Sequence, residues 1–430
     1  MNLLHANDRA GHYPPSFYAA TATPFAPQPP LQGDATTDVA IIGAGYTGLS
    51  SALHLAQKGF RVTVLEAHRA GFGASGRNGG QVGTGQRLDQ ATLETMLGRE
   101  RAHQLWDIGA EAKALVRSLI QSHRMPVTFY PGIAHPCRTE AEVRHSRDNA
   151  SLLARDYDYT DIVPLSRAEM AGLIGSDTYL GGDIDRGAGH IHPLNYAIGI
   201  ANAALAAGAT IHELSEVTRV DHGPEITLHT AQGRLTARHL ILACNGYLGA
   251  LEPRIAARVM PINSYIIATE PLDKPLIAEP VAVTDTKFVN NYWRMSEDGR
   301  LLFGGAETYG YRFPDVASIV RKPLLKVYPQ LEDTSIDFAW GGTLAITVNR
   351  LPCFARPAPN IWSASGYSGY GVAMASMAGK ILAEAVAGQA GHFDVMAGLP
   401  QTQFPGGTKL RAPLLVLAMT WYALRDRLGI

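Results

Sequence analysis

The sequence predicts an α/β fold with two structural parts. Residues 38–45 (DVAIIGAG) form an apolar run that ends in glycines, which is typical of a buried parallel strand. An apolar stripe with helical spacing over 46–59 and a strand-like run over 61–67 complete a strand–helix–strand unit. The chain has 430 residues, too many for one ordinary hydrophobic core, so two domains or one domain split by insertions are expected.

The composition is that of a globular protein without a strong charge bias. Apolar residues make up 46% of the chain and charged residues 17%. The net charge of −1 gives no electrostatic reason to expect nucleic acid or an anionic membrane surface as a partner. The three cysteines lie far apart without a CxxC pair, which indicates a reducing, cytoplasmic compartment rather than a disulfide framework. No metal-ligand spacing appears, so we expect no metal site.

We expect neither a signal peptide nor a transmembrane segment. Residues 1–30 lack the basic start and apolar run of a signal peptide. The apolar stretch 412–424 is too short to cross a bilayer of roughly 30 Å at about 1.5 Å per residue. A terminal helix docked on the core is expected there, with an interfacial membrane helix or an oligomer contact as the alternatives.

Three later stretches continue the α/β pattern. An apolar stripe predicts a helix over 101–123. Residues 192–208 predict a helix with Pro193 at its first position and a glycine just past its end. Residues 361–388 read as a strand, a glycine turn and a helix rich in small residues.

The first glycine motif predicts a dinucleotide site. Gly43, Gly45 and Gly48 fit G-x-G-x-x-G between the first strand and the first helix. These glycines allow a tight turn, the close approach of a pyrophosphate and close packing of helix on strand. Glu66 ends the second strand, about 20 residues further on, where a carboxylate binds the adenosine ribose.

A second glycine-rich loop favours a flavin over a nicotinamide dinucleotide. Residues 70–86 (AGFGASGRNGGQVGTGQ) contain seven glycines and begin four residues after Glu66. Ser75, Arg77 and Asn78 offer polar groups to a ribityl chain, and Gly79 with Gly80 would let the backbone lie against a flat ring. A nicotinamide dehydrogenase remains an alternative.

The stretch 43–81 resembles the FAD-dependent D-amino-acid oxidase-like amine oxidases, within them the branch that oxidises gamma-glutamylputrescine. Further stretches match that branch along the chain, at 16–24, 189–199, 290–305, 366–372, 404–414 and 424–430. The resemblance implies a Rossmann-like FAD-binding domain of the D-amino-acid oxidase type with a mixed-sheet substrate domain. It divides the chain into FAD-binding segments 36–95, 186–254 and 336–395, substrate-domain segments 96–185 and 255–335, and a C-terminal extension 396–430.

The motifs and the resemblance together give a set of expected FAD-binding residues. In this family the helix after GYSGYGV points its N-terminus at the pyrimidine end of the flavin, although an ordinary buried helix is the alternative. Val217 matches the position whose backbone meets the adenine. The expected residues are Gly43, Gly45, Tyr46, Thr47, Gly48, Glu66, Ala67, Gly73, Ala74, Ser75, Gly76, Arg77, Asn78, Gly79, Gly80, Gln81, Val217, Gly369, Tyr370, Gly371 and Val372.

The resemblance implies oxidation of an amine to an imine, which water hydrolyses to an aldehyde and ammonia, as in polyamine catabolism. The substrate amine must be neutral, so a dry aromatic site is expected. Candidate lining residues are Tyr292, Trp293, Tyr367 and Tyr370, with ordinary residues of the hydrophobic core as the alternative. For the glutamyl carboxylate the candidates are Arg294 and Arg350, with surface arginines as the alternative.

His192 completes the candidates, but it and His190 are more simply explained as capping or core histidines, because a helix begins at Pro193. No catalytic residue can be assigned from the sequence.

Two departures from the sarcosine-oxidase branch matter. Residues 299–305 carry no lysine where that branch has one linked with oxygen activation, which counts against O2 as the electron acceptor. O2 is still the expected acceptor, with a dehydrogenase as the alternative. Cys353 does not fall where that branch attaches its flavin, so non-covalent FAD is expected.

A cyclic or N-alkyl amino acid substrate such as pipecolate or sarcosine, and a non-catalytic flavoprotein, are the remaining alternatives. The preferred polyamine and the oligomeric state stay open.

Overall fold

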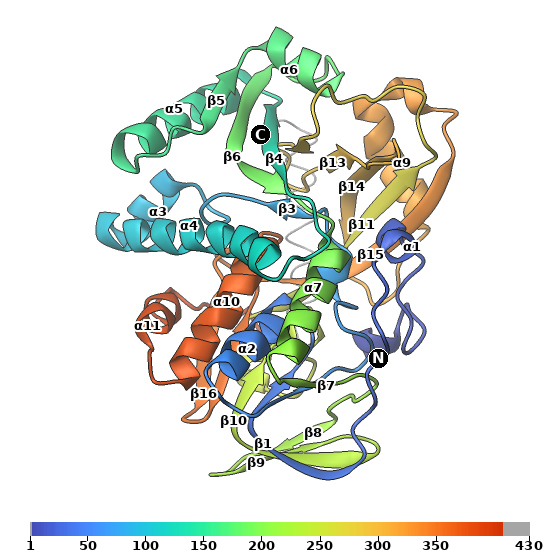
Figure 1. Cartoon of the computed structure of the whole chain (residues 1–430). Coiled ribbons are helices and arrows are strands. Elements are labelled where there is room, and N and C mark those ends of the chain that lie inside the picture. The colour runs from blue at the N-terminus through green and yellow to red at the C-terminus, as the bar shows by residue number, and fades with distance from the viewer. Residues whose placement is uncertain (1, 407–430) are drawn as a thin grey trace.

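The computed structural model describes residues 2–406, which form two mixed β-sheets with helices packed around them (Figure 1). The first sheet has the strand order β16-β17-β10-β1-β2-β7, and β9 and β8 extend it from β10. Its strands are β1 (Gly33–Ile42), β2 (Val62–Leu65), β7 (Thr210–His212), β8 (Arg219–Asp221), β9 (Ile226–His229), β10 (Gly233–Leu242), β16 (Cys353–Ala358) and β17 (Ile361–Ser365). The strands β17, β10, β1, β2 and β7 are parallel, as the apolar run at 38–45 predicts.

Helices cover one face of the first sheet and share its core. They are α2 (Tyr46–Gln57), α4 (Arg99–Ser122), α7 (Pro193–Ala206) and α10 (Gly371–Val386), with α3 (Gln90–Leu97) and α11 (Gly391–Ala397) beside them. The expected helices over 101–123 and 192–208 are α4 and α7, and Pro193 stands at the first position of α7. The helix expected after the second glycine turn is α10, whose small residues let it pack closely against α2.

The second sheet has the strand order β15-β11-β14-β13-β12-β4-β6-β3, with β5 paired to β6. Its strands are β3 (Gln81–Val82), β4 (Tyr130–Cys137), β5 (Ile162–Leu165), β6 (Gly181–His190), β11 (Met260–Thr269), β12 (Ala282–Thr284), β13 (Tyr292–Met295), β14 (Leu301–Thr308) and β15 (Ile336–Ile346). The helices α5 (Glu140–Asp156), α6 (Arg167–Ile174) and α9 (Val316–Val327) pack on this part, which has its own apolar core. Short helical segments complete the described chain: η1 (Leu3–His5), α1 (Phe17–Thr21), η2 (Ala74–Gly76), η3 (Asn245–Tyr247), α8 (Pro253–Ala256) and η4 (Pro329–Leu331).

The structure moves several expected segment boundaries. β15 pairs with β11 in the second sheet, so the boundary expected at 335/336 falls after Ile346. β3 and the end of β6 also belong to the second sheet, although residues 81–82 and 186–190 were expected with the FAD-binding segments. Conversely, α4 was expected in the substrate domain but packs against α10 in the first core. Strand and helix patterns are local, whereas the choice of sheet partner depends on residues far away in the chain.

The described residues bear on the expectations about disulfides, metal sites and membrane-spanning helices. Cys137, Cys244 and Cys353 form no disulfide with one another. Over residues 2–406 no group of three or more histidine, cysteine, aspartate or glutamate side chains is placed to hold a metal ion. In the same range no single helix is long and apolar enough to cross a membrane, and one bent pair, α10 with α11, passes only when the two are taken together. The stretch 412–424 lies outside the described residues.

Candidate functional site

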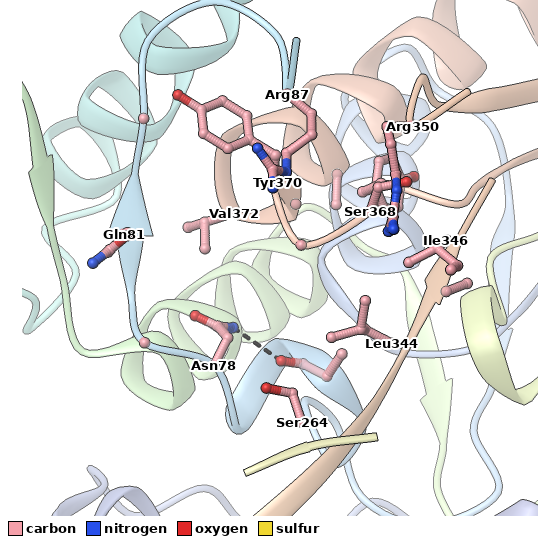
Figure 2. Close-up of a pocket in the computed structure, with 18 of the residues that line it drawn as sticks. Asn78, Gln81, Arg87, Ser264, Leu344, Ile346, Arg350, Ser368, Tyr370 and Val372 are labelled. Atoms are coloured by element: carbon pink, nitrogen blue, oxygen red, sulfur yellow. Dashed lines mark hydrogen bonds between the residues drawn. The ribbon is translucent and has the colours of Figure 1, made fainter. Parts of the chain in front are cut away.

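A cavity of about 1060 Å³ lies where the two sheets meet, and Figure 2 shows a close-up of its lining. The carboxyl ends of β1 and β2, the start of α2, the second glycine loop and the turn before α10 all open into it. Ligands of open α/β sheets bind outside the carboxyl ends of the strands, at such a crevice. Of the expected FAD-binding residues, the following line the cavity: Gly43, Gly45, Tyr46, Thr47, Glu66, Ala67, Gly73, Ala74, Ser75, Arg77, Asn78, Gly79, Gln81, Val217, Gly369, Tyr370, Gly371 and Val372.

The first glycine motif leaves the start of α2 open to the cavity. Gly43 has a φ of +103°, and a Cβ atom on it would lie 2.9 Å from the carbonyl oxygen of Ala243. Gly45 is the N-cap of α2 and has no side chain to cap the first turn. Gly48 does not line the cavity, because a Cβ atom there would lie 1.9 Å from the carbonyl oxygen of Gly43, so it permits helix and strand to touch. The unpaired N–H groups and the positive end of the helix dipole suit a phosphate.

Glu66 is fixed at the end of β2. Its Oε2 accepts a hydrogen bond from the backbone N–H of Ala44 at 2.7 Å, and its Oε1 accepts one from His68 at 2.9 Å. Burial raises the pKa of this carboxyl group, and the backbone hydrogen bonds act in the opposite direction. A carboxylate has about four acceptor sites, so the group keeps acceptor capacity for hydroxyl groups in the cavity.

The second glycine loop is held rigidly between the two parts. The Ser75 hydroxyl accepts from the N–H of Tyr46 at 2.9 Å, which ties the loop to α2. Asn78 closes the loop on itself, since its Oδ1 accepts from the N–H of Gly80 at 2.8 Å. From the second sheet, the indole N–H of Trp340 donates to the backbone oxygen of Arg77 at 3.0 Å. The loop therefore keeps its shape through both parts of the fold.

Two glycines of this loop shape the backbone and do not face the cavity. A Cβ atom on Gly76 would lie 2.3 Å from the carbonyl oxygen of Gly71. Gly80 has a φ of +76°, and a Cβ atom there would lie 2.0 Å from the carbonyl oxygen of Ile191. The expectation that Gly80 faces the ring is therefore corrected to a contact with the chain before α7, whereas Gly79 does line the cavity. Gly83, a later glycine of the same loop, leaves room for the Tyr370 hydroxyl.

A second helix N-terminus opens into the same cavity. α10 begins at Gly371, and its N-cap, Tyr370, makes no side-chain cap hydrogen bond. α2 and α10 thus present two open N-termini to one continuous space, together with the Glu66 carboxyl group. A ligand with a pyrophosphate, a ribose and a second site of developing negative charge matches this arrangement. FAD has these features.

Comparison with known proteins decides the family. A profile of the DAO family, described as FAD dependent oxidoreductase, matches residues 38–385. The chain belongs to this family. The enzyme is 41% identical over 419 residues to the "Probable oxidoreductase OrdL" of Rhizobium meliloti (strain 1021), covering 96% of this chain and 97% of the relative. It is 40% identical over 421 residues to the gamma-glutamylputrescine oxidoreductase of Escherichia coli (strain K12), covering 96% and 99%.

Solved structures confirm the D-amino-acid oxidase type of fold. Glycine oxidase from Geobacillus kaustophilus matches with a TM-score of 0.73 at 21% identity, over 86% of this chain and 99% of that one. L-proline dehydrogenase from P. horikoshii matches with a TM-score of 0.69 at 20% identity, over 93% and 99%. The enzyme is an FAD-dependent oxidoreductase, so the alternative of a non-catalytic flavoprotein is wrong.

Tyr292, Tyr370, Arg87, Arg350 and Glu307 also line the cavity, and we call the part of the cavity that these five residues line the substrate chamber. Tyr367 also lines the cavity, with its hydroxyl 2.7 Å from that of Thr47. Burial raises the pKa of the Tyr292, Tyr367 and Tyr370 hydroxyls, so all three stay neutral. In Figure 2 Arg87 and Arg350 lie at one end of the view, with Asn78 and Ser264 at the other.

The structure places Trp293 and Arg294 away from the cavity lining. Trp293 points into the core of the second part, where its indole N–H donates to the hydroxyl of Tyr328 at 2.9 Å. Arg294 is buried behind the second glycine loop, where it donates to the backbone oxygen of Gly79 at 3.3 Å and the hydroxyl of Tyr18 at 3.4 Å. These contacts hold Arg294 inside the protein, away from the cavity in which a substrate carboxylate could bind.

The two histidines have structural surroundings. The Nδ1 of His192 accepts from the N–H of Asn195 at 3.1 Å, so His192 caps α7 and is not part of the cavity lining. Burial, with Arg294 nearby, lowers the pKa of His192 to about 4. Burial likewise lowers the pKa of His190 to about 3, and its Nε2 lies 3.0 Å from the backbone oxygen of Pro280. Both rings are neutral near pH 7.

Sequence reasoning missed several lining residues. Arg87 directly follows the second glycine loop, and this position is the one feature of the sequence that could have indicated that it lines the cavity. Ser264, Glu307, Leu344 and Ile346 come from β11, β14 and β15, whose meeting point depends on long-range strand pairing. Backbone strain also marks the region, because three lining residues with side chains have positive φ, Arg350 (+64°), Ser368 (+53°) and Asn245 (+46°), as does Ala306 (+85°) next to Glu307.

Proposed function

We propose that this enzyme oxidises the C–N bond of a gamma-glutamylated amine, such as gamma-glutamylputrescine, to an imine that water hydrolyses to an aldehyde and ammonia. The observation that carries the proposal is the substrate chamber, in which a cationic end containing Arg350 and an aromatic wall share one cavity with the glycine loops. The full-length likeness to the Escherichia coli gamma-glutamylputrescine oxidoreductase supports the same substrate class.

The cofactor would be held along the cavity in the order of its parts. The open start of α2 would take the pyrophosphate, Glu66 the adenosine ribose, and the backbone at Val217 the adenine. Ser75, Asn78 and Gly79 would lie along the ribityl chain and the ring, and the start of α10 would face the pyrimidine end. Bound FAD supplies a two-electron acceptor for the hydride that leaves the carbon next to nitrogen.

The chamber walls favour a neutral substrate amine. An amine can give up a hydride from its carbon only when its nitrogen lone pair is free, so the ammonium form must first lose a proton. The rings of Tyr292 and Tyr370 replace water around this group, and their hydroxyls are occupied by Ser264 at 3.2 Å and by the backbone oxygen of Thr84 at 2.7 Å. A low-dielectric wall lowers the pKa of an amine, which makes the reactive form available.

Two guanidinium groups would hold the glutamyl carboxylate. Arg350 and Arg87 both line the chamber, and Arg350 also lies 5.6 Å from the centre of the Phe288 ring. Arginine binds a carboxylate through paired N–H donors, which fixes orientation as well as position. A head held at this end would direct the distal amine of the substrate toward the aromatic wall.

We further propose that FAD is bound non-covalently. Cys244 and Cys137 line the cavity, but burial raises the pKa of each thiol to about 12, so neither is a thiolate near pH 7. Cys353 is fully buried in β16. Acid precipitation of the purified enzyme should therefore leave all of the flavin absorbance in the supernatant. A yellow pellet that keeps its flavin after washing would contradict this.

Product analysis tests the proposed reaction. With gamma-glutamylputrescine in air, the enzyme should release ammonia and H2O2, each in a one-to-one ratio with the amine consumed, because O2 takes the two electrons removed from the C–N bond. Underivatised putrescine, which lacks the glutamyl head, serves as the matched substrate and should react much more slowly. Ammonia that forms only after an artificial electron acceptor is added, without H2O2, would identify a dehydrogenase. No ammonia with or without that acceptor would contradict the substrate class.

A further inference from the structure

The end of β14 carries an acidic side chain into the cationic end of the substrate chamber. Glu307 lines the cavity that Arg350 and Arg87 also line. The Tyr309 hydroxyl lies 3.5 Å from Glu307 Oε2. Burial raises the pKa of Glu307, while the charges of Arg350 and Arg87 act to lower it. The charges of Arg350 and Arg87 therefore act on the Glu307 carboxyl group within one cavity.

A β-bulge aims Glu307 into the chamber. Next to β11, Gly304 pairs with Ile266 and Glu307 pairs with Ser264, so Gly305 and Ala306 stand opposite the single residue Tyr265. Without this extra residue Glu307 would pair with Asn263, whose side chain points to the other face of the sheet. The bulge instead places Glu307 on the face of Ser264, which lines the cavity.

The bulge has a conformational cost at Ala306. Ala306 adopts a φ of +85°, a value at which glycine is strongly preferred over residues with a Cβ atom. Bulges of this kind re-aim side chains and are common next to active sites. Strained backbone conformations persist where the surrounding structure holds them, and they cluster at functional sites. At Ala306 the strained conformation determines the direction of the Glu307 side chain.

We propose that Glu307 binds the α-ammonium group of an amino-acid head on the substrate, beside the arginines that take its carboxylate. The inference rests on the proposed function and adds to it that the head must be zwitterionic, since two guanidinium groups and one carboxylate complement a carboxylate and an ammonium on neighbouring atoms. Binding to Glu307 keeps the α-amino group protonated, so it cannot be oxidised. The substrate is then oxidised only at its distal amine.

Two amines that differ only at the α-carbon test this inference. Gamma-glutamylputrescine carries the α-ammonium group, whereas glutarylputrescine has hydrogen in its place and keeps the carboxylate. For the wild-type enzyme we expect kcat/KM to favour gamma-glutamylputrescine by about 10- to 100-fold, the worth of a charge-assisted hydrogen bond. Glu307→Gln should reduce this preference to near unity by raising KM for gamma-glutamylputrescine, and Glu307→Asp should retain part of it.

The controls separate recognition from structure. Glu332→Gln removes an exposed carboxylate from the same part of the chain and should keep the full preference. The flavin absorbance and thermal midpoint of each variant report whether it folds and binds its cofactor. A wild-type enzyme without the preference, or a Glu307→Gln variant that loses activity equally on both amines, overturns the inference and shows Glu307 as a mere counter-ion of the arginines. No reaction of the wild type with either amine overturns the proposed function as well.

Discussion

Replacing Gly80 with alanine should yield a protein that has lost most of its flavin. A Cβ atom at this position would lie 2.0 Å from the carbonyl oxygen of Ile191, and the φ of +76° is unfavourable for any residue with a side chain. The backbone oxygen of Gly80 also accepts from the N–H of Ile191 at 2.9 Å, so the loop cannot move away without losing this link. We expect a low ratio of flavin absorbance to protein absorbance in the purified variant.

Gly388→Ala is the matched control for this substitution. Gly388 has a φ of +90°, but nothing lies within 4 Å of a Cβ atom built there. It should cost only the roughly 1–2 kcal/mol of a strained backbone and keep its flavin. Gly80→Ala should reduce the free energy of unfolding by more than this amount, because backbone strain and a backbone clash add. A Gly80→Ala protein with full flavin content would show that the loop does not form the cofactor wall.

Replacing Arg350 with glutamine should raise KM for gamma-glutamylputrescine strongly. If Arg350 holds the glutamyl carboxylate, its loss leaves that carboxylate partly unpaired inside the chamber, which costs at least about 2 kcal/mol or about 30-fold in affinity. The turnover of putrescine, which has no carboxylate, should change little, so the two substrates should become more alike. Steady-state kinetics with both amines measures this difference.

Arg312→Gln is the control for the Arg350 variant. Arg312 is exposed and does not line the cavity, so its replacement should leave both substrates unaffected. If Arg350→Gln reduced the turnover of both amines by the same factor, Arg350 would support the chamber structurally and would not recognise the head. If it left both unchanged, the glutamyl end would have to bind elsewhere.

The parts of the site that the sequence predicts well are those encoded by short local spacing. Gly43, Gly45 and Glu66 come from one strand–helix–strand unit, and the structure places them on one cavity as expected. Pro193 predicted the start of α7, and with it the capping role of His192. In each case backbone geometry over a few residues decides the outcome.

The positions of the site residues that the sequence did not predict depend on contacts between segments far apart in the chain. Glu307 faces the cavity only because a bulge changes the pairing of β14 with β11, and nothing in residues 301–308 alone shows where the bulge lies. Arg294 stands two residues from Tyr292, yet it lies behind Gly79 rather than in the chamber. Arg87 directly follows the second glycine loop in the sequence. Its place in the cavity lining becomes visible only once α10 and β15 close the same cavity.

An anaerobic titration tests the central claim most directly. The purified yellow enzyme is mixed with gamma-glutamylputrescine under nitrogen, and the flavin absorbance is followed, so neither the acceptor nor the later hydrolysis enters the measurement. We predict complete bleaching of the oxidised flavin at one equivalent of amine per bound flavin. A flavin that stays oxidised in the presence of excess gamma-glutamylputrescine would contradict the proposed function.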